Sequence, residues 1–174
     1  DAILSRGLGD VYKRQLYRQE IQLKTLLFVS HTPSENTAKL ANSCMAAIDD
    51  ITDDLIIFHK SSVDVVSEDV LTCDGLLLAT TENIGYMAGL TKDLFDRCYN
   101  EWMGTTDGLP AAVYIRAGLD GTATSRAISQ IAAGLSWRLI RPPLILRGDY
   151  TQQFEEDVAE LGGAFSAGLE TGVF

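Results

Sequence analysis

Short apolar segments alternate with amphipathic helices along most of the chain, and this alternation constrains the fold more than any other feature. Almost wholly apolar segments of this length are typical of strands that are buried on both faces of a sheet. They cover residues 25–30, 55–58, 75–79, 111–115 and 144–146. A chain that returns to such a strand after each helix is expected to form a parallel sheet with helices on both faces.

The segments between these strands carry the three- and four-residue apolar spacing of helices with one buried face. The predicted helices cover residues 36–49, 88–102, 122–135 and 154–169, with an irregular connection over 63–71. Leu90, Leu94, Phe95, Cys98 and Trp102 form the stripe of the second helix. Right-handed crossovers leave few topologies for five such strands, and the order 2-1-3-4-5 is the commonest. We therefore predict an α/β three-layer sandwich whose five-stranded parallel sheet has that order.

Residues 1–23 do not share this pattern. They contain a basic cluster, no regular apolar period and no initiator Met. The string from Leu8 to Gln15 resembles translated adapter sequence, and a short natural extension is the alternative. We therefore predict a non-domain extension over residues 1–23 and one domain over residues 24–174.

Charge and cysteine usage exclude several classes of partner. The 24 acidic and 14 basic side chains give a net charge of -10, which disfavours nucleic acid and anionic membranes. The three cysteines lie far apart without the spacing of a zinc site or a redox dithiol, so reduced thiols are expected. No apolar run has the length of a membrane span, and no secretion signal is recognisable. We expect a cytoplasmic protein without membrane insertion.

The candidate ligand site lies where the winding of the sheet reverses, beyond the carboxyl ends of the strands. We call residues 30–37 the first loop, residues 80–89 the second loop and residues 116–122 the third loop. The first loop places five hydroxyl or amide side chains between a buried strand and a helix N-terminus, which favours a bound phosphate. Ordinary helix capping by Ser34 or Asn36 is the alternative.

Three other phosphate chemistries fit the sequence poorly. The first loop has neither GxxxxGK[ST] nor GxGxxG, so it is neither a nucleoside-triphosphate loop nor a dinucleotide fingerprint. A response-regulator receiver needs Asp at the ends of the first and third strands, around Mg²⁺. Those ends here read Val29-Ser30-His31 and Ala79-Thr80-Thr81.

All three loops resemble those of the flavodoxin-like FMN-binding proteins, which include flavodoxins and NAD(P)H-dependent flavin and quinone reductases. Thr32-Pro33-Ser34-Glu35-Asn36-Thr37 matches the family phosphate loop Ser/Thr-x-Thr-Gly-Asn-Thr in register, with Glu35 in place of the usual Gly. That carboxylate suits the helix dipole and can pair with Lys39. The resemblance covers most of residues 24–169 and implies a flavodoxin-like fold with FMN as cofactor.

The second loop is the more specific match, because the run from Cys73 to Arg97 resembles the family segment that embraces the flavin. It implies that Gly85 lets the backbone approach the isoalloxazine and that backbone groups of Asn83–Tyr86 meet its N5 and pyrimidine edges. Thr81 replaces the usual Pro. The cofactor-binding residues implied by the resemblance are Thr32, Ser34, Asn36, Thr37, Thr81, Glu82, Asn83, Ile84, Gly85, Tyr86, Met87, Ala117, Gly118 and Gly121, with no metal ligand and no catalytic side chain.

The third loop resembles the small Ala-Gly-x-x-Gly loop of the reductases, which leaves one face of the flavin open to a nicotinamide or a quinone. This favours an enzyme that passes hydride from NAD(P)H to FMN and then reduces a quinone or free flavin in a ping-pong cycle. The alternatives are an electron-transfer carrier that does not oxidise NAD(P)H, and a flavin-free interaction module. A redox protein partner and a homo-oligomer are left open.

The remaining polar residues are expected to be structural or solvated. His31 is predicted as a solvated loop residue, and His59 as a structural residue at the end of the second strand, away from the site. The acidic clusters at 49–50, 53–54 and 155–157 are expected to be solvated, or to form a rim that docks a basic redox partner.

Overall fold

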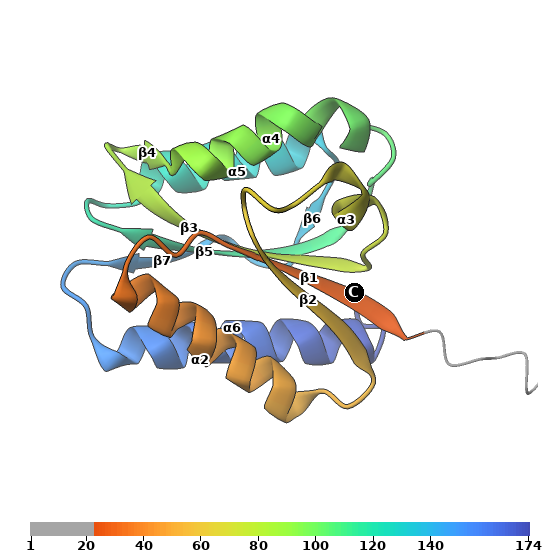
Figure 1. The fold of residues 1–174 in the computed structure, drawn as a ribbon, viewed down its shortest axis with the longest axis horizontal. Coiled ribbons are helices and arrows are strands. Elements are labelled where there is room, and N and C mark those ends of the chain that lie inside the picture. The colour runs from red at the N-terminus through yellow and green to blue at the C-terminus, as the bar shows by residue number, and fades with distance from the viewer. Residues whose placement is uncertain (1–22) are drawn as a thin grey trace, which may run out of the picture.

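The computed structural model describes residues 23–174, and its central sheet has the predicted strand order (Figure 1). β1 (Lys24–Ser30) pairs in parallel with β2 (Leu55–Ser61) on one side and with β3 (Gly75–Asn83) on the other. β5 (Pro110–Ala117) follows β3, and β7 (Leu144–Arg147) follows β5, again in parallel. These five strands confirm the order 2-1-3-4-5. The predicted extension, apart from Leu23, lies outside the described residues.

Two further strands of two residues each were not predicted. β4 (Tyr86–Met87) pairs antiparallel with the end of β3, and β6 (Arg138–Leu139) pairs in parallel with the start of β5. A two-residue strand carries no alternating pattern, so the sequence gives no signal for it.

The predicted end of the third strand at Ala79 was wrong, because β3 continues to Asn83. Thr80 and Thr81 remain in register with β5, and both are buried. The Thr80 hydroxyl is hydrogen-bonded to the Thr91 hydroxyl at 2.7 Å, so the hydroxyl groups of Thr80 and Thr91 have a partner inside the protein. The second loop is therefore mostly a β-hairpin.

Helices cover both faces of the sheet (Figure 1). α2 (Glu35–Ile51) and α6 (Gln152–Glu170) lie on one face, and α4 (Gly89–Trp102) and α5 (Thr122–Gly134) lie on the other. The short α3 (Ser67–Leu71) lies within the predicted irregular connection, and its five residues are too few to show a helical period.

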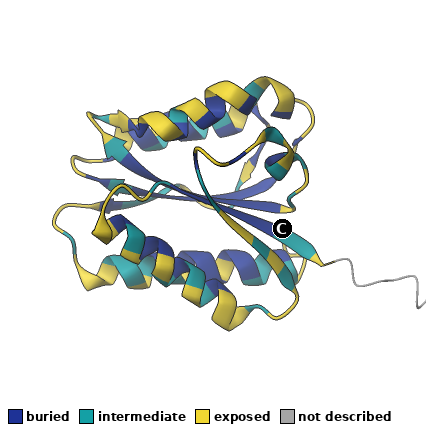
Figure 2. Cartoon of the chain, viewed as in Figure 1, coloured by how far each residue is buried: buried dark blue, intermediate teal, exposed yellow. Residues whose placement is uncertain are grey.

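The strands and the inner faces of the helices form the buried core (Figure 2). The aromatic centre of the α4/α5 layer is Trp102, which is fully buried, with the rings of Phe95 and Trp137 at centroid distances of 6.4 and 5.6 Å. Leu90 was predicted to belong to the same buried stripe, and this was wrong: it is 45% exposed. Leu90 lies in the first turn of α4, beyond the edge of the core.

The close approach of α2 to α6 depends on residues without a bulky side chain. A Cβ atom at Gly162 would lie 2.5 Å from the Cys44 Sγ, and one at Gly163 would meet the Ile51 side chain. Cys44, Cys73 and Cys98 are free thiols. Burial raises the pKa of Cys44 and of Cys73 to about 12, which disfavours a reactive thiolate at both positions.

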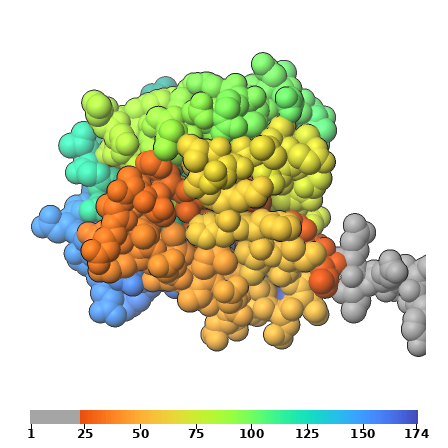
Figure 3. Space-filling view, in the orientation of Figure 1, coloured from red at the N-terminus to blue at the C-terminus, as the bar shows by residue number. Residues whose placement is uncertain are grey.

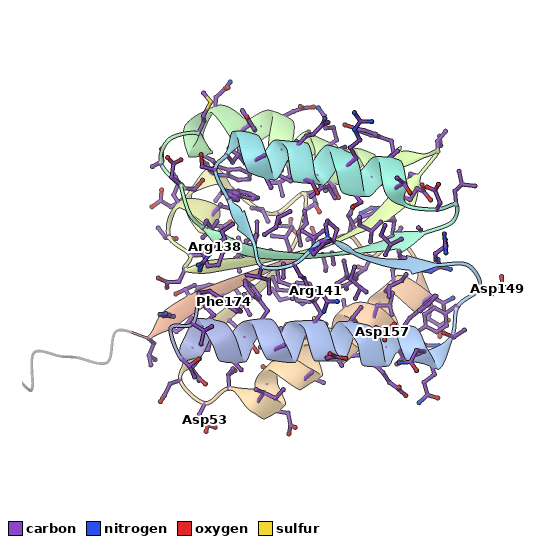
Figure 4. All side chains as sticks on the ribbon, turned by 180° about the vertical axis from the view of Figure 1, so that it is seen from behind. Asp53, Arg138, Arg141, Asp149, Asp157 and Phe174 are labelled. Carbon is purple, nitrogen blue, oxygen red and sulfur yellow. The ribbon has the colours of Figure 1, made fainter. Side chains whose placement is uncertain are left out.

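The C-terminal residue packs back onto the domain. Phe174 stacks on Phe165 at a centroid distance of 5.8 Å, and the Arg138 guanidinium lies 6.0 Å from the centre of the Phe174 ring. Arg138 and Phe174 lie near one end of α6, whereas Asp149 lies near the other (Figure 4). Within residues 23–174, no helix combines the length and the apolar character needed to cross a membrane.

Candidate functional site

The first loop ends in a capping box at the start of α2. Ser34 is the N-cap, and its Oγ accepts a hydrogen bond from the Thr37 N–H at 3.3 Å. The Thr37 Oγ1 accepts from the Ser34 N–H at 3.0 Å and donates to the Ser34 carbonyl at 2.8 Å. These two predicted phosphate ligands therefore also hold each other, and the buried Thr37 hydroxyl is fully used inside the loop.

The capping box leaves the next two amides available to an anion. Among the described residues, the N–H groups of Glu35 and Asn36 have no hydrogen-bond acceptor, as is usual in the first turn of a helix. The side chains of Thr32 and Asn36 are exposed beside them. The Glu35 carboxylate pairs with Lys39 at 3.1 Å, as the sequence predicted, and both side chains are well exposed. The first loop therefore presents backbone donors at the positive end of α2.

The second loop turns sharply at its tip. Ile84 and Gly85 both have positive φ, of 51° and 73°, between the paired residues Asn83 and Tyr86. This is the backbone of a two-residue hairpin turn, which normally takes Asn or Gly at its first position. A β-branched residue in this conformation is strained, and the Ile84 side chain is fully exposed.

Glu82 joins the second loop to the third. Its carboxylate accepts hydrogen bonds from the Leu119 N–H at 2.7 Å and from the Gly121 N–H at 3.2 Å. The Asp120 carboxylate accepts from the Thr122 N–H at 2.8 Å and so shapes the same turn. Glu82 thus fixes the distance between the two loops that the resemblance assigns to the flavin ring.

Arg116 holds the other side of the third loop, a role that the sequence did not indicate. Its guanidinium donates to the carbonyls of Ala117, Leu146 and Gly148, the last two at 3.0 and 2.6 Å. It also lies 5.4 Å from the centre of the Phe154 ring. The cation therefore ties the third loop to the end of β7 and the start of α6.

Space remains open above two of the predicted contact residues. A Cβ atom at Gly85 or at Gly118 would have no neighbour within 4 Å. Gly121, in contrast, is packed: its φ is +70°, and a Cβ atom there would lie 2.6 Å from the Ile145 side chain. Ala117 and Met87 are buried below this surface. Open glycine backbone beside ordered loops fits a flat ring that lies against the main chain.

The structure corrects the predicted isolation of His59. β2 continues past Phe58, so His59 lies beside the end of β1, where its Nε2 is 2.8 Å from the Ser30 Oγ. Its ring stacks on Phe28 at a centroid distance of 4.6 Å. Burial lowers the pKa of both His59 and His31 below the ordinary value of 6.5. His59 thus supports the base of the first loop.

A cavity of about 350 Å³ adjoins the first loop. Its lining comes from Ser30–Pro33, from Ser61–Val63 and from Leu90. The first loop, the residues after β2 and the start of α4 meet at the surface in Figure 3. The buried Ser62 Oγ has no hydrogen-bond partner among the described residues. The sequence did not single out Ser62 or Leu90 as site residues, because each adjoins the loop only through the tertiary fold.

Within the described part of the chain, no group of three or more His, Cys, Asp or Glu side chains could hold a metal ion. The site instead combines free amides, hydroxyl groups and open glycine backbone. That donor set fits FMN, whose phosphate the Thr32 hydroxyl and the Glu35 and Asn36 amides would hold, and whose ring the second and third loops would contact.

Comparison with known proteins identifies the fold. No protein-family model and no curated protein matches the sequence. A flavodoxin from the domain Archaea superposes with a TM-score of 0.71 at 14% identity, over 83% of this chain and 98% of that chain. Flavodoxin 1 from Bacillus cereus gives 0.66 at 15% identity, over 82% and 97%. A WrbA-like flavodoxin protein from Agrobacterium tumefaciens gives 0.63 at 8% identity, over 86% and 99%. With its strand order, its helical layers and these neighbours, the chain has the flavodoxin-like fold.

Proposed function

We propose that this protein binds FMN at the three loops and acts as an NAD(P)H-dependent oxidoreductase that reduces a quinone, free flavin or a similar small acceptor. The observation that carries the proposal is the pair of hydrogen bonds that the Glu82 carboxylate accepts from Leu119 and Gly121, which we call the Glu82 clasp. It holds the second and third loops together beside a helix start with free amide donors. Bound FMN supplies the hydride and electron transfer, and the protein supplies binding and orientation.

The first loop forms the phosphate end of the proposed FMN site. The Glu35 and Asn36 amides and the Thr32 hydroxyl hold the phosphate, while the Ser34–Thr37 capping box keeps the helix start in place. The Glu35 side chain does not oppose the phosphate strongly, because it is 85% exposed and paired with Lys39. This pairing weighs against the alternative of a flavin-free interaction module.

The size of the third loop favours an enzyme over a carrier. Gly118 is exposed with open space above it, and the buried Ala117 adds no bulk. The third loop therefore places no aromatic side chain over the ring, and the face of the ring turned away from the loop stays open to a second substrate. The likeness in fold to flavodoxins favours the second candidate, a one-electron carrier that accepts its electrons from a redox protein. Tyr86, 42% exposed in β4, is the aromatic residue within the three loops that can cover a ring in that case.

Under this proposal the partners are NAD(P)H and a small-molecule acceptor in the cytoplasm. A redox protein is the partner of the carrier alternative, and a second copy of the chain is compatible with either function.

An anaerobic titration of the FMN-loaded protein separates the two candidates. NADPH or NADH is added under nitrogen while the visible flavin absorbance is followed, and a quinone is then added. The enzyme is expected to lose its flavin absorbance with NAD(P)H and to regain it with the quinone. Flavin that stays oxidised until dithionite is added would contradict the enzyme and support the carrier.

A further inference from the structure

A second cavity, of about 450 Å³, lies between the hairpin and α5. It borders the site because it shares Tyr86 with the second loop and Asp120 with the third. Its lining residues are Tyr86, Asp120, Thr122, Ala123, Arg126, Ala127 and Gln130. Of these residues only Tyr86 is also assigned to FMN, through its backbone, so its side chain and the α5 residues remain for another ligand.

The polar groups of this cavity are suited to an anion that also carries an aromatic ring. Arg126 is exposed, and within residues 23–174 its guanidinium makes no ion pair. Gln130 lies one helical turn further along the same face of α5 and adds amide donors. The Asp120 carboxylate is held by its own turn, where it accepts from the Thr122 N–H. Tyr86 adds a partly exposed ring on the facing strand.

We propose that this cavity binds the adenosine end of NADPH, with Arg126 taking the 2′-phosphate and Tyr86 stacking on the adenine. The proposal rests on the proposed function, since it names which nicotinamide cofactor that site takes. A guanidinium binds phosphate through two parallel hydrogen bonds, and NADH lacks this phosphate. In a protein of net charge -10, a local cation also offsets the repulsion of a polyanionic nucleotide. Arg126 therefore selects NADPH over NADH.

Calorimetric titration with adenosine 2′,5′-bisphosphate and with 5′-AMP tests this assignment on the full chain, with and without FMN. The two probes differ only in the 2′-phosphate, and neither carries a nicotinamide. We expect the bisphosphate to bind about tenfold or more tightly than 5′-AMP, the effect of one charge-assisted phosphate contact. Arg126→Ala is expected to abolish that difference, and Arg126→Lys to retain part of it.

Arg141→Ala is the matched control, because it removes one exposed arginine from the connection between β6 and β7. It is expected to keep the preference for the bisphosphate. Equal affinities for the two probes, or an unchanged preference in Arg126→Ala, would overturn the assignment. Tyr86→Ala is expected to lower the affinity for both probes by the same factor. Unchanged affinities would show that Tyr86 does not stack on the adenine.

Failure of the site and failure of the function give different results. If the probes bind as expected while NADPH leaves bound FMN oxidised, the nucleotide site stands and the reductase proposal is wrong. If NADPH reduces FMN while the wild-type protein does not distinguish the two probes, the reductase stands and Arg126 has no such role.

Discussion

Replacing Glu82 with glutamine removes the charge that joins the second loop to the third. The glutamine amide keeps one acceptor oxygen, so the variant loses one of the two hydrogen bonds, to Leu119 or to Gly121, and the charge assistance of the other. A hydrogen bond to a charged group contributes about 1.5–3 kcal/mol when it is buried. Glu82 is half-buried, so we expect a loss of about 1–2 kcal/mol in the free energy of unfolding, after discounting for solvent screening.

The assays are thermal unfolding and amide hydrogen exchange. In a domain of this size the expected loss lowers Tm by about 2–8 °C. Exchange at Leu119 and Gly121 should accelerate more than exchange at the β5 amides, because local opening of the third loop becomes easier. The affinity for FMN should fall as well, since the loops are no longer held at a fixed distance.

Glu101→Gln is the matched control for Glu82→Gln. Glu101 is an exposed residue of α4, so the same loss of charge there should change stability by less than about 0.5 kcal/mol. If both variants had the same Tm and the same exchange rates at the third loop, the clasp would have no energetic role and our reasoning would be refuted.

Three further perturbations test other parts of the structure. Gly118→Ala should change Tm by no more than about 1 °C, since a Cβ atom there meets nothing within 4 Å. The affinity for FMN should nevertheless fall at least about tenfold, because the added methyl group meets the ring. Unchanged affinity in a fluorescence titration would place the ring elsewhere. Gly162→Ala should lower the free energy of unfolding by about 1–3 kcal/mol in urea denaturation, because its methyl group would overlap the Cys44 Sγ, and an unaltered midpoint would contradict the tight α2/α6 packing. Burial lowers the pKa of His31 and His59 in the folded protein. As the pH falls toward 6.5 and below, the unfolded chain therefore takes up protons that the folded chain does not. The free energy of unfolding should therefore decrease between pH 7.5 and pH 5.5. In the double variant His31→Asn/His59→Asn the free energy of unfolding should decrease less steeply with falling pH. An identical slope would show that these histidines do not cause the pH dependence.

Local periodicity was enough to predict the layers of this fold. The stripe of Leu94, Phe95, Cys98 and Trp102 is buried as predicted, because a helical period depends only on nearby residues. The end of β3 could not be predicted in this way. Thr80 and Thr81 are polar and continue the strand only because β5 pairs with them and, for Thr80, because the Thr91 hydroxyl satisfies its side chain.

The residues that shape the site come from distant parts of the sequence. Glu82 reaches amides 37 and 39 residues further along the chain, and Arg116 reaches carbonyls 30 and 32 residues away. The resemblance implied a cofactor-binding role for Glu82, but only the tertiary structure reveals the clasp between two loops. The role of each first-loop residue in binding FMN stays a prediction.

The central claim is that the first loop binds the phosphate of FMN, and comparing the affinities of FMN and riboflavin tests it most directly. Riboflavin has the same ring without the phosphate. Charged hydrogen bonds to the free amides of Glu35 and Asn36 should make FMN bind about 10- to 100-fold more tightly in a fluorescence titration. Equal affinities for the two flavins, or no binding of either at micromolar concentration, would contradict the account.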